Sequence, residues 1–195
     1  MVNDQNNIRA VLLGHERVPV VTFNEGDDPV AFMRYLLNDG VKCIEITLRT
    51  PYGLPAIKAI REAFGKEVVI GAGTVLGPEQ LPALKEAQTD FLVSPGATDA
   101  LIDAMDESGM AYLPGAVTPS EIMHLRSRGL RTLKFFPAHL FGGKDALKAY
   151  GQLFPDVVFC PTGGIKKETS NEYLSLSNVF AVGGSWFQKA YQEKR

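Results

Sequence analysis

Short runs of β-branched and aromatic residues recur along this chain at a spacing of roughly 20 to 25 residues, the size of one strand plus one helix. The eight strand-forming runs begin near Val18, Lys42, Glu67, Asp90, Ala111, Thr132, Asp156 and Asn178. Between them lie amphipathic stretches with marked starts. Proline takes the first helical position at Asp28-Pro29, Thr50-Pro51 and Gly77-Pro78, and Thr118–Glu121 forms a capping box. This alternation of strand and helix predicts an α/β protein with parallel strands.

The number of repeats favours a closed ring of strands. Eight regular strand–helix units in 195 residues leave no room for a large insertion or a linker. That arrangement is typical of a (β/α)₈ barrel near the lower end of its size range. An open, doubly wound sheet is the alternative. We therefore predict a single (β/α)₈ TIM-barrel domain over residues 1–195, with an extra N-terminal helix over residues 3–14.

Composition excludes several classes of partner. The formal net charge is -2, and no basic stretch is interleaved with aromatic residues, so we expect no nucleic-acid binding. No apolar run reaches the roughly 20 residues of a membrane span, and the polar start at residues 1–5 is unlike a signal peptide. Cys43 and Cys160 lie in different predicted strands, which favours free thiols in a reducing cytoplasm. The three histidines are scattered, so no metal site is predicted.

Lys134 is a cation at a strand position where the sequence pattern predicts an apolar side chain. In residues 132–138, alternation places Thr132, Lys134 and Phe136 on one face of the strand. The flanking phenylalanines exclude water, and desolvation lowers the pKa of an ammonium group. An amine that is partly unprotonated near neutral pH can attack a carbonyl and form a Schiff base. The alternative is a lysine that extends to solvent from a strand end.

A second strand, predicted over residues 42–49, adds a carboxylate and a guanidinium. Glu45 and Arg49 share one face with Cys43 and Thr47, opposite an apolar face. In an antiparallel sheet that polar face would lie in water. In a barrel it faces the interior, where Glu45, Arg49 and Lys134 converge at the carboxyl ends of the strands. A structural ion pair inside the barrel is the alternative to a reactive group.

Glycine-rich segments directly follow several of the predicted strands. Thr162–Gly164 follows the seventh strand and Gly183–Ser185 the eighth, the two loops that form the recurring phosphate site of such barrels. Gly71–Thr74, after the third strand, supplies close backbone approach and a hydroxyl for a carboxylate, or a tight turn. Cys160 lacks a neighbouring histidine and is interpreted as a packed core residue.

Taken together, the motifs resemble one family along nearly the whole chain, from about Pro19 to Trp186. The motifs are Glu45-Ile-Thr-Leu-Arg-Thr50, Gly71-Ala-Gly-Thr-Val75, Ser94-Pro-Gly96, Lys134-Phe-Phe-Pro-Ala138, Pro161-Thr-Gly-Gly-Ile165 and Gly183-Gly-Ser-Trp186. This set strongly resembles the bacterial class I aldolases of 2-keto-3-deoxy-6-phosphogluconate, also known as 4-hydroxy-2-oxoglutarate aldolases. Many members carry an acidic residue where this chain has His139.

The resemblance implies a (β/α)₈ barrel, a homotrimer, and cleavage of a phosphorylated keto sugar acid to pyruvate and glyceraldehyde 3-phosphate without a cofactor. It implies that Lys134 forms the Schiff base and that Glu45 is the general acid/base. It also implies substrate-binding residues: Arg49 and Thr74 for the carboxylate, Pro95 and Phe136 for packing on the pyruvate moiety, Thr162 for hydroxyls, and Gly163, Gly164, Gly184 and Ser185 for the phosphate.

Two other functions are compatible with the same residues. An aldolase of the galactonate series shares the lysine and the glutamate, and would differ in hydroxyl contacts such as that of Thr162. A non-catalytic phosphosugar-binding barrel would use Lys134 only as a charge, and it has no need of a desolvated lysine beside a base.

Overall fold

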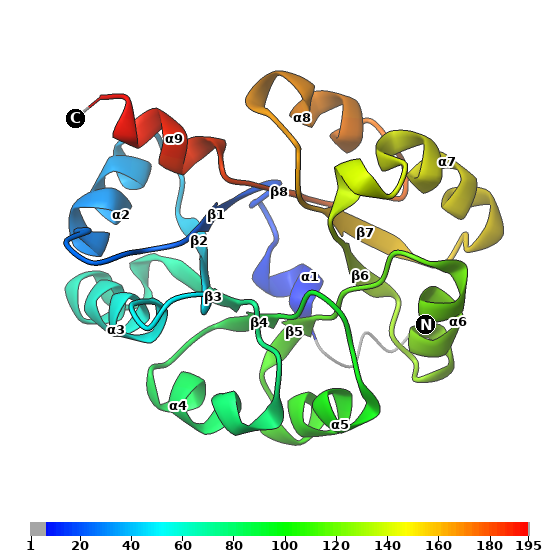
Figure 1. Cartoon of the computed structure of the whole chain (residues 1–195), viewed down its shortest axis with the longest axis horizontal. Coiled ribbons are helices and arrows are strands. Elements are labelled where there is room, and N and C mark those ends of the chain that lie inside the picture. Colours follow the sequence, from blue (N-terminus) through cyan, green and yellow to red (C-terminus); the bar gives the residue numbers. More distant parts are fainter. Residues whose placement is uncertain (1–6, 195) are drawn as a thin grey trace.

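The computed structural model of the chain describes residues 7–194. In this range eight short parallel strands form a ring, and the helices surround it (Figure 1). The strands are β1 Arg17–Val21, β2 Cys43–Thr47, β3 Val69–Gly73, β4 Phe91–Val93, β5 Ala111–Leu113, β6 Thr132–Phe135, β7 Val158–Pro161 and β8 Val182–Gly184. The last strand begins later than predicted, because the chain near Asn178 pairs with β7 only through an isolated bridge at Val179.

Helices alternate with the strands as predicted. The α-helices are α1 Ile8–Val11, α2 Pro29–Asn38, α3 Gly53–Phe64, α4 Leu81–Glu86, α5 Asp99–Ser108, α6 Pro119–Ser127, α7 Gly143–Leu153, α8 Lys167–Leu174 and α9 Trp186–Gln192. Short 3₁₀ turns are η1 Gly65–Glu67, η2 Pro78–Gln80 and η3 Ala138–Leu140. None of the helices in residues 7–194 is long and apolar enough to cross a bilayer.

The ring closes through hydrogen bonds at two seams. Six strands pair in the order β5-β4-β3-β2-β1-β8, and β6 pairs with β7. At one seam the amide of Lys134 donates to the carbonyl of Pro114 at 2.8 Å, and at the other the amide of Phe159 donates to the carbonyl of Asn178 at 2.8 Å. The barrel prediction is confirmed, and the open doubly wound sheet is wrong.

Two apolar cores follow from the period-2 alternation of each strand. Residues on the outer face, such as Ile44 and Phe135, pack beneath the helices. A smaller core fills the barrel interior, where Cys43 and Phe91 meet Ile8 of α1. Because the interior residues near α1 come from the amino ends of the strands, α1 closes that end of the barrel and the carboxyl ends stay accessible.

The N-terminal helix is shorter than predicted. Of the predicted range 3–14, residues 3–6 lie outside the described residues, and α1 occupies only Ile8–Val11. The chain then turns, and Gly14 has a φ of 80°, a left-handed conformation that glycine adopts without a steric penalty and that does not continue a helix.

The sequence signals for helix starts differ in accuracy. Asp28 caps α2 by accepting from the amide of Ala31 at 2.9 Å, and the Thr118–Glu121 capping box of α6 is present. Helix α3, in contrast, begins at Gly53 rather than directly at Pro51. The hydroxyl of Thr50 donates to the carbonyl of Phe23 at 2.6 Å, which holds this segment as a turn before the helix starts.

Candidate active site

Lys134 and Glu45 meet inside the barrel although they are far apart in the sequence. Lys134 Nζ lies 3.1 Å from Glu45 Oε1, and the two residues are 3% and 4% exposed. β6 and β2 each turn alternate residues inward, which brings these two side chains together across the ring. The lysine therefore does not extend to solvent, and the carboxylate face of β2 does not lie in water.

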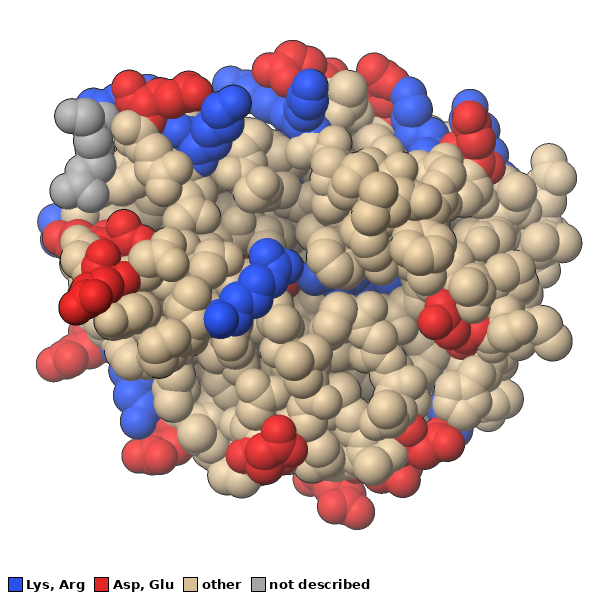
Figure 2. Space-filling view, in the orientation of Figure 1, with Lys and Arg blue, Asp and Glu red and all other residues tan. Residues whose placement is uncertain are grey.

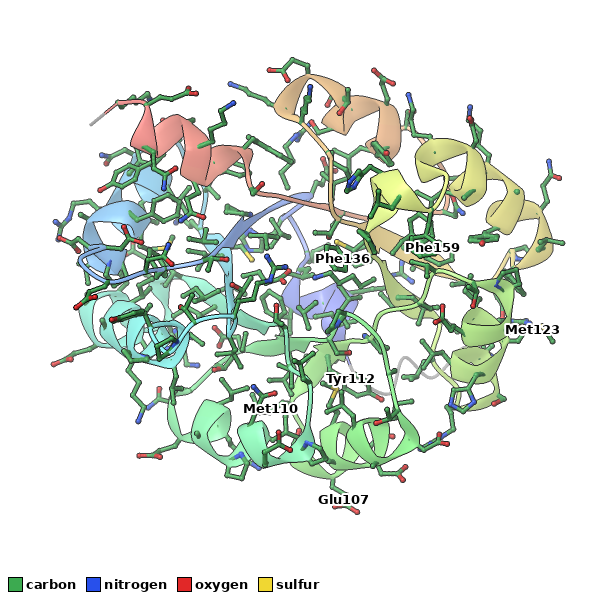
Figure 3. All side chains as sticks on the ribbon, in the orientation of Figure 1. Glu107, Met110, Tyr112, Met123, Phe136 and Phe159 are labelled. Carbon is green, nitrogen blue, oxygen red and sulfur yellow. The ribbon has the colours of Figure 1, made fainter. Side chains whose placement is uncertain are left out.

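The surroundings of this pair are shaped by an aromatic ring and a glycine. Lys134 Nζ lies 5.1 Å from the centre of the Phe136 ring, which follows β6 and forms a cis peptide bond with Pro137. Figure 3 shows Phe136 inside the ring of strands and Phe159 outside it. A Cβ atom on Gly73 would lie 2.2 Å from Glu45 Oε1, so only glycine leaves room for the carboxylate here.

Cys160 is the strand neighbour of Lys134 and has no reactive character. The thiol is buried, and burial, followed by the charge of Glu45, raises the pKa of Cys160 to about 12. Burial likewise raises the pKa of the Cys43 thiol. Both thiols therefore stay protonated at neutral pH, so neither of them is a reactive thiolate beside Lys134. The prediction of a packed core cysteine is confirmed.

Arg49 and Thr74 lie at the carboxyl ends of neighbouring strands. β2 ends at Thr47, which pairs with Gly73 at the end of β3. Arg49 is therefore in the turn after β2 rather than in the strand, and it is exposed. Within residues 7–194 its guanidinium makes no hydrogen bond or ion pair, so its charge is free for a ligand. Figure 2 shows basic side chains at the centre of the face above the ring of strands, with acidic side chains mostly at the periphery.

Thr74 has a backbone conformation that is unusual for its residue type. Its φ is 61°, in the left-handed region, where β-branched residues are genuine outliers. Such strain persists where the surrounding structure imposes it, and it clusters at functional sites. Sequence reasoning interpreted Gly71–Thr74 through its glycines and missed this signal, because a backbone angle is visible only in the fold.

Pro95 and Thr162 line the same end of the barrel. Pro95 follows β4 and is half-buried, and a Cβ atom on Gly115 would lie 2.2 Å from its carbonyl oxygen. Thr162 follows β7 and is 5% exposed, and a Cβ atom on Gly183 would lie 2.3 Å from its hydroxyl. Gly115 thus makes space for the main chain at Pro95, and Gly183 makes space for the Thr162 side chain.

The loops that carry the two glycine doublets border one cavity of about 490 Å³, the first through Gly164 and the second through Ser185. Gly164 lines it from the loop before α8, and Ser185 lines it from the start of α9. Gly163 and Gly164 have φ values of 97° and 74°, which favour glycine. A Cβ atom on Gly164 would lie 2.5 Å from the Cβ atom of His139, so the imidazole packs directly against this loop.

Several side chains around this cavity were not predicted. Lys166, Lys167 and Lys189 line it together with Gly164 and Ser185. Sequence reasoning concentrated on the backbone of the glycines. The available signals were the lysine pair directly after Ile165 and the spacing of four residues between Ser185 and Lys189, which is one helical turn.

A polar contact between the first two strands was also missed. The hydroxyls of Thr22 and Thr47 are 2.7 Å apart at the end of β1 and β2. Gln188 of α9 accepts from the amide of Thr22 at 3.2 Å and donates to its carbonyl at 2.7 Å. These bonds fix α9, and with it Ser185, relative to the mouth of the barrel.

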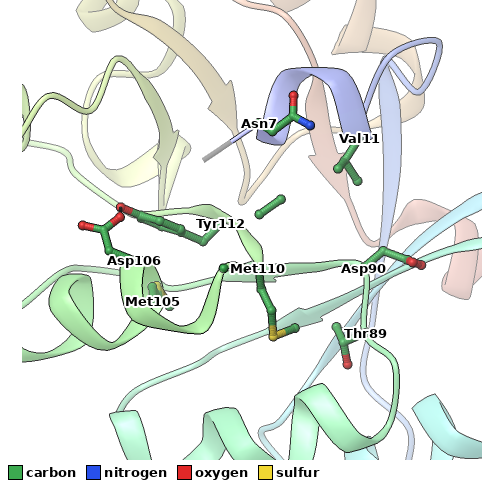
Figure 4. Close-up of a pocket in the computed structure, with 10 residues that line it drawn as sticks. Asn7, Val11, Thr89, Asp90, Met105, Asp106, Met110 and Tyr112 are labelled. Carbon is green, nitrogen blue, oxygen red and sulfur yellow. Dashed lines mark hydrogen bonds between the residues drawn. The ribbon is translucent and has the colours of Figure 1, made fainter. Parts of the chain in front are cut away.

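A second cavity, of about 410 Å³, lies at the opposite end of the strands (Figure 4). Asp90 and Met110 line it just before β4 and β5, beside α1. Its carboxylates already have partners, because Asp90 pairs with Arg61 and Asp106 accepts from the hydroxyl of Tyr112 at 2.6 Å. This cavity is remote from Lys134 and offers no unpaired charge. Within residues 7–194, no group of three or more His, Cys, Asp or Glu side chains is arranged to hold a metal ion.

Comparison with known proteins identifies the family. Residues 8–194 match the family model described as "KDPG and KHG aldolase". The "KHG/KDPG aldolase" of Escherichia coli K12 is 40% identical over 190 residues, which cover 97% of this chain and 89% of that protein. The "2-dehydro-3-deoxy-phosphogluconate aldolase" of Pseudoalteromonas atlantica is 43% identical over 169 residues, 87% of this chain and 78% of that protein.

A solved structure gives the same assignment. The KDPG aldolase from Legionella pneumophila, solved with pyruvate captured as a covalent carbinolamine intermediate, has a TM-score of 0.89 and 38% identity, and the match covers 95% of this chain and 90% of that one. The (β/α)₈ ring, the buried lysine–glutamate pair and these matches agree with one another. The chain therefore belongs to the KDPG and KHG aldolase family.

Proposed function

We propose that this chain is a class I aldolase that cleaves 2-dehydro-3-deoxy-6-phosphogluconate to pyruvate and glyceraldehyde 3-phosphate. The same chemistry converts 4-hydroxy-2-oxoglutarate to pyruvate and glyoxylate. The observation that carries the proposal is the contact of 3.1 Å between Lys134 Nζ and Glu45 Oε1 in a water-poor barrel. A nucleophile within hydrogen-bond reach of a base is the arrangement that covalent catalysis requires.

The reaction begins with attack of the Lys134 amine on the C2 carbonyl of the keto acid. A carbinolamine forms, loses water and becomes a protonated imine. Glu45 is the nearest acid/base group and exchanges the protons of these steps. The Legionella relative was captured with pyruvate at the carbinolamine stage, which supports the same intermediate on Lys134 here.

Carbon–carbon cleavage uses the imine as an electron sink. Glu45 removes the proton of the C4 hydroxyl, the C3–C4 bond breaks, and its electron pair moves into the imine to give an enamine. The aldehyde leaves, and Glu45 returns a proton to the enamine carbon. Hydrolysis of the resulting imine releases pyruvate and regenerates the Lys134 amine. The phenyl ring of Phe136, 5.1 Å from Nζ, helps to stabilise positive charge on the nitrogen.

Binding groups are distributed around the mouth. The unpaired guanidinium of Arg49 and the hydroxyl of Thr74 hold the carboxylate, and Pro95 and Phe136 pack on the pyruvate moiety. Thr162 contacts the substrate hydroxyls. The backbone of Gly163, Gly164 and Gly184, with Ser185, holds the phosphate. The shared cavity of Gly164 and Ser185 supports the last assignment.

We further propose that residues 1–195 form one domain, that three chains associate into a homotrimer, and that the protein acts in the cytoplasm. The family resemblance supports the trimer. The two buried free thiols support a reducing compartment. Sedimentation of the purified protein tests the trimer, which requires three times the mass of one chain.

Trapping with borohydride tests the central step. The protein is incubated with pyruvate and sodium borohydride, and the reduced adduct is mapped by peptide mass spectrometry. We expect the adduct on the peptide that contains Lys134 and its loss in Lys134→Ala. An unmodified wild-type protein would favour a phosphosugar-binding barrel without catalysis. Cleavage of the galactonate isomer in preference to the gluconate isomer would assign the protein to the other aldolase series.

A further inference from the structure

The cavity between α8 and α9 has a lining that the glycine loops alone do not explain. Three lysines, Lys166, Lys167 and Lys189, line this cavity together with Gly164 and Ser185. We call these three residues the lysine collar. Figure 2 shows basic side chains along the upper edge of the molecule, over α8 and α9, with acidic side chains between them.

The charges of the collar are available to a ligand. Lys166 and Lys167 form no ion pair in the described part of the chain. Lys189 lies 3.9 Å from Glu193, and both side chains are largely exposed, at 79% and 67%. An exposed pair at that separation contributes little, so it leaves most of the lysine's charge free to act on an anion.

The main chain holds the collar in place. Lys189 directly follows Gln188, whose two hydrogen bonds with Thr22 fix α9 to the end of β1. The amide of Lys166 donates to the hydroxyl of Thr169 at 3.1 Å, which fixes the start of α8. The lysine stems therefore begin from fixed points on both sides of the cavity.

Two glutamates, whose negative charge opposes that of the lysine collar, also belong to the lining. Glu168 and Glu193 also border the cavity. A ligand with a dianionic phosphate is attracted by the collar and repelled by these carboxylates. A ligand that ends in a singly charged carboxylate experiences about half of each interaction at the same distance, and a neutral aldehyde experiences almost none.

We infer that the lysine collar sets the preference of this site for a phosphorylated keto acid over an unphosphorylated one. The inference rests on the proposed aldolase function and adds specificity residues beyond the glycine loops and Ser185. The collar acts on binding of the phosphate and not on the imine chemistry at Lys134, so its effect is confined to KM of the phosphorylated substrate.

The first test compares two substrates in lysine variants. Lys166→Met and Lys189→Met keep an unbranched side chain and remove the charge. We expect KM for 2-dehydro-3-deoxy-6-phosphogluconate to rise about five-fold in each, with kcat unchanged. The kcat/KM for 4-hydroxy-2-oxoglutarate stays within about two-fold of wild type. Lys58→Met is the matched control, because Lys58 also lies 3.9 Å from a glutamate but on α3. We expect Lys58→Met to leave the kinetic constants for both substrates unchanged.

The second test removes a negative charge from the cavity instead of a positive one. Glu193→Gln removes a negative charge from the lining, so we expect KM for the phosphorylated substrate to fall about two-fold at low ionic strength. Raising the salt concentration to about 1 M shrinks all of these differences. Equal losses on both substrates, no loss on either, or the same direction of change in lysine and glutamate variants would overturn the inference.

A third measurement does not depend on turnover. Trp186 is the single tryptophan of the chain, and its ring lies over Gly184 at the cavity. Titration with inorganic phosphate changes its fluorescence, and we expect the apparent Kd to rise about five-fold in Lys189→Met. An unchanged Kd in that variant counts against the collar. Failure of borohydride trapping, with this phosphate response intact, would instead remove the aldolase proposal and leave the anion site.

Discussion

Glu45 has two tasks at the scale of single residues, since it pairs with Lys134 and is the only carboxylate that contacts it in the described range. A buried ion pair is costly to break when one partner alone is removed. A substitution that keeps a hydrogen-bonding side chain of the same size separates the structural task from proton transfer.

We predict that Glu45→Gln still traps pyruvate with borohydride but cleaves the phosphorylated substrate about 10²- to 10⁴-fold more slowly, because an amide cannot accept and return the proton. Steady-state kinetics and adduct yield measure the two effects separately. Near-normal cleavage in this variant would remove Glu45 from the acid/base role.

Gly73 tests how closely the barrel interior is fitted. A Cβ atom there would lie 2.2 Å from Glu45 Oε1, so Gly73→Ala must displace the carboxylate from Lys134. We expect a loss of stability of about 1 to 3 kcal/mol and a large loss of activity. Thermal unfolding and kinetics measure both.

Gly96→Ala is the control for that substitution. A Cβ atom on Gly96 would meet nothing within 4 Å, and Gly96 does not have a left-handed φ. Its unfolding temperature is expected to match wild type. If Gly73→Ala also left the unfolding temperature unchanged, the inference that Glu45 packs closely against Gly73 would be wrong.

At the scale of elements, the start of α6 shows how one cap links stability to pH. The Glu121 carboxylate accepts from the amides of Val117 at 2.9 Å and Thr118 at 2.8 Å. Burial acts to raise the pKa of Glu121, but these hydrogen bonds outweigh it and lower that pKa from its usual value. The lowered pKa means that the cap stabilises the fold above the ordinary pKa of about 4.3 and loses this contribution as pH falls through the lowered value.

We predict that Glu121→Gln lowers the free energy of unfolding by about 0.5 to 1 kcal/mol at pH 7, because the charged cap is lost. The loss is small because the side chain is largely exposed. The difference shrinks as the pH is lowered from 7 and the wild-type carboxyl becomes protonated. Urea unfolding at a series of acidic pH values measures it. The control is Glu107→Gln on α5, where Figure 3 shows Glu107 directed away from the molecule. A difference for Glu121→Gln that is independent of pH would contradict the account.

At the scale of the whole molecule, Arg61 ties together segments that close the amino end of the barrel. Its guanidinium donates to the carbonyls of Gln88 and Val68, each at 3.2 Å, and to that of Gly65. It also forms an ion pair with Asp90, and it is only 7% exposed. One side chain thus joins α3, η1 and the starts of β3 and β4.

We predict that Arg61→Met destabilises the protein by about 3 kcal/mol, because three carbonyls and a partly buried carboxylate lose their donor. For a chain of this size the unfolding temperature would fall by roughly 6 to 12 °C. Lys66→Met is the control, since Lys66 also pairs with Asp90 but its side chain is 68% exposed, and it should change stability by less than about 0.5 kcal/mol.

The same experiment examines whether the chain is one domain. Trp186 fluorescence reports on α9, while far-UV circular dichroism reports on all helices. A single cooperative domain gives superimposable unfolding curves from the two probes, in wild type and in Arg61→Met. Separate transitions would divide the chain into independently folding parts.

The sequence by itself determined the strand–helix alternation, the inward phase of Lys134 and Glu45, and the glycine loops after the last strands, because period-2 patterns and turn residues are local properties. The helix starts at Asp28 and Thr118 were also predictable from the sequence, because each cap involves residues only three positions apart. Tertiary structure alone decided which inward side chains meet. Ring closure places β2 opposite β6 and brings lysines from α9 and the start of α8 around one cavity, and in the folded chain Thr74 has a left-handed conformation. Those facts depend on contacts between segments far apart in the chain, which no local pattern encodes.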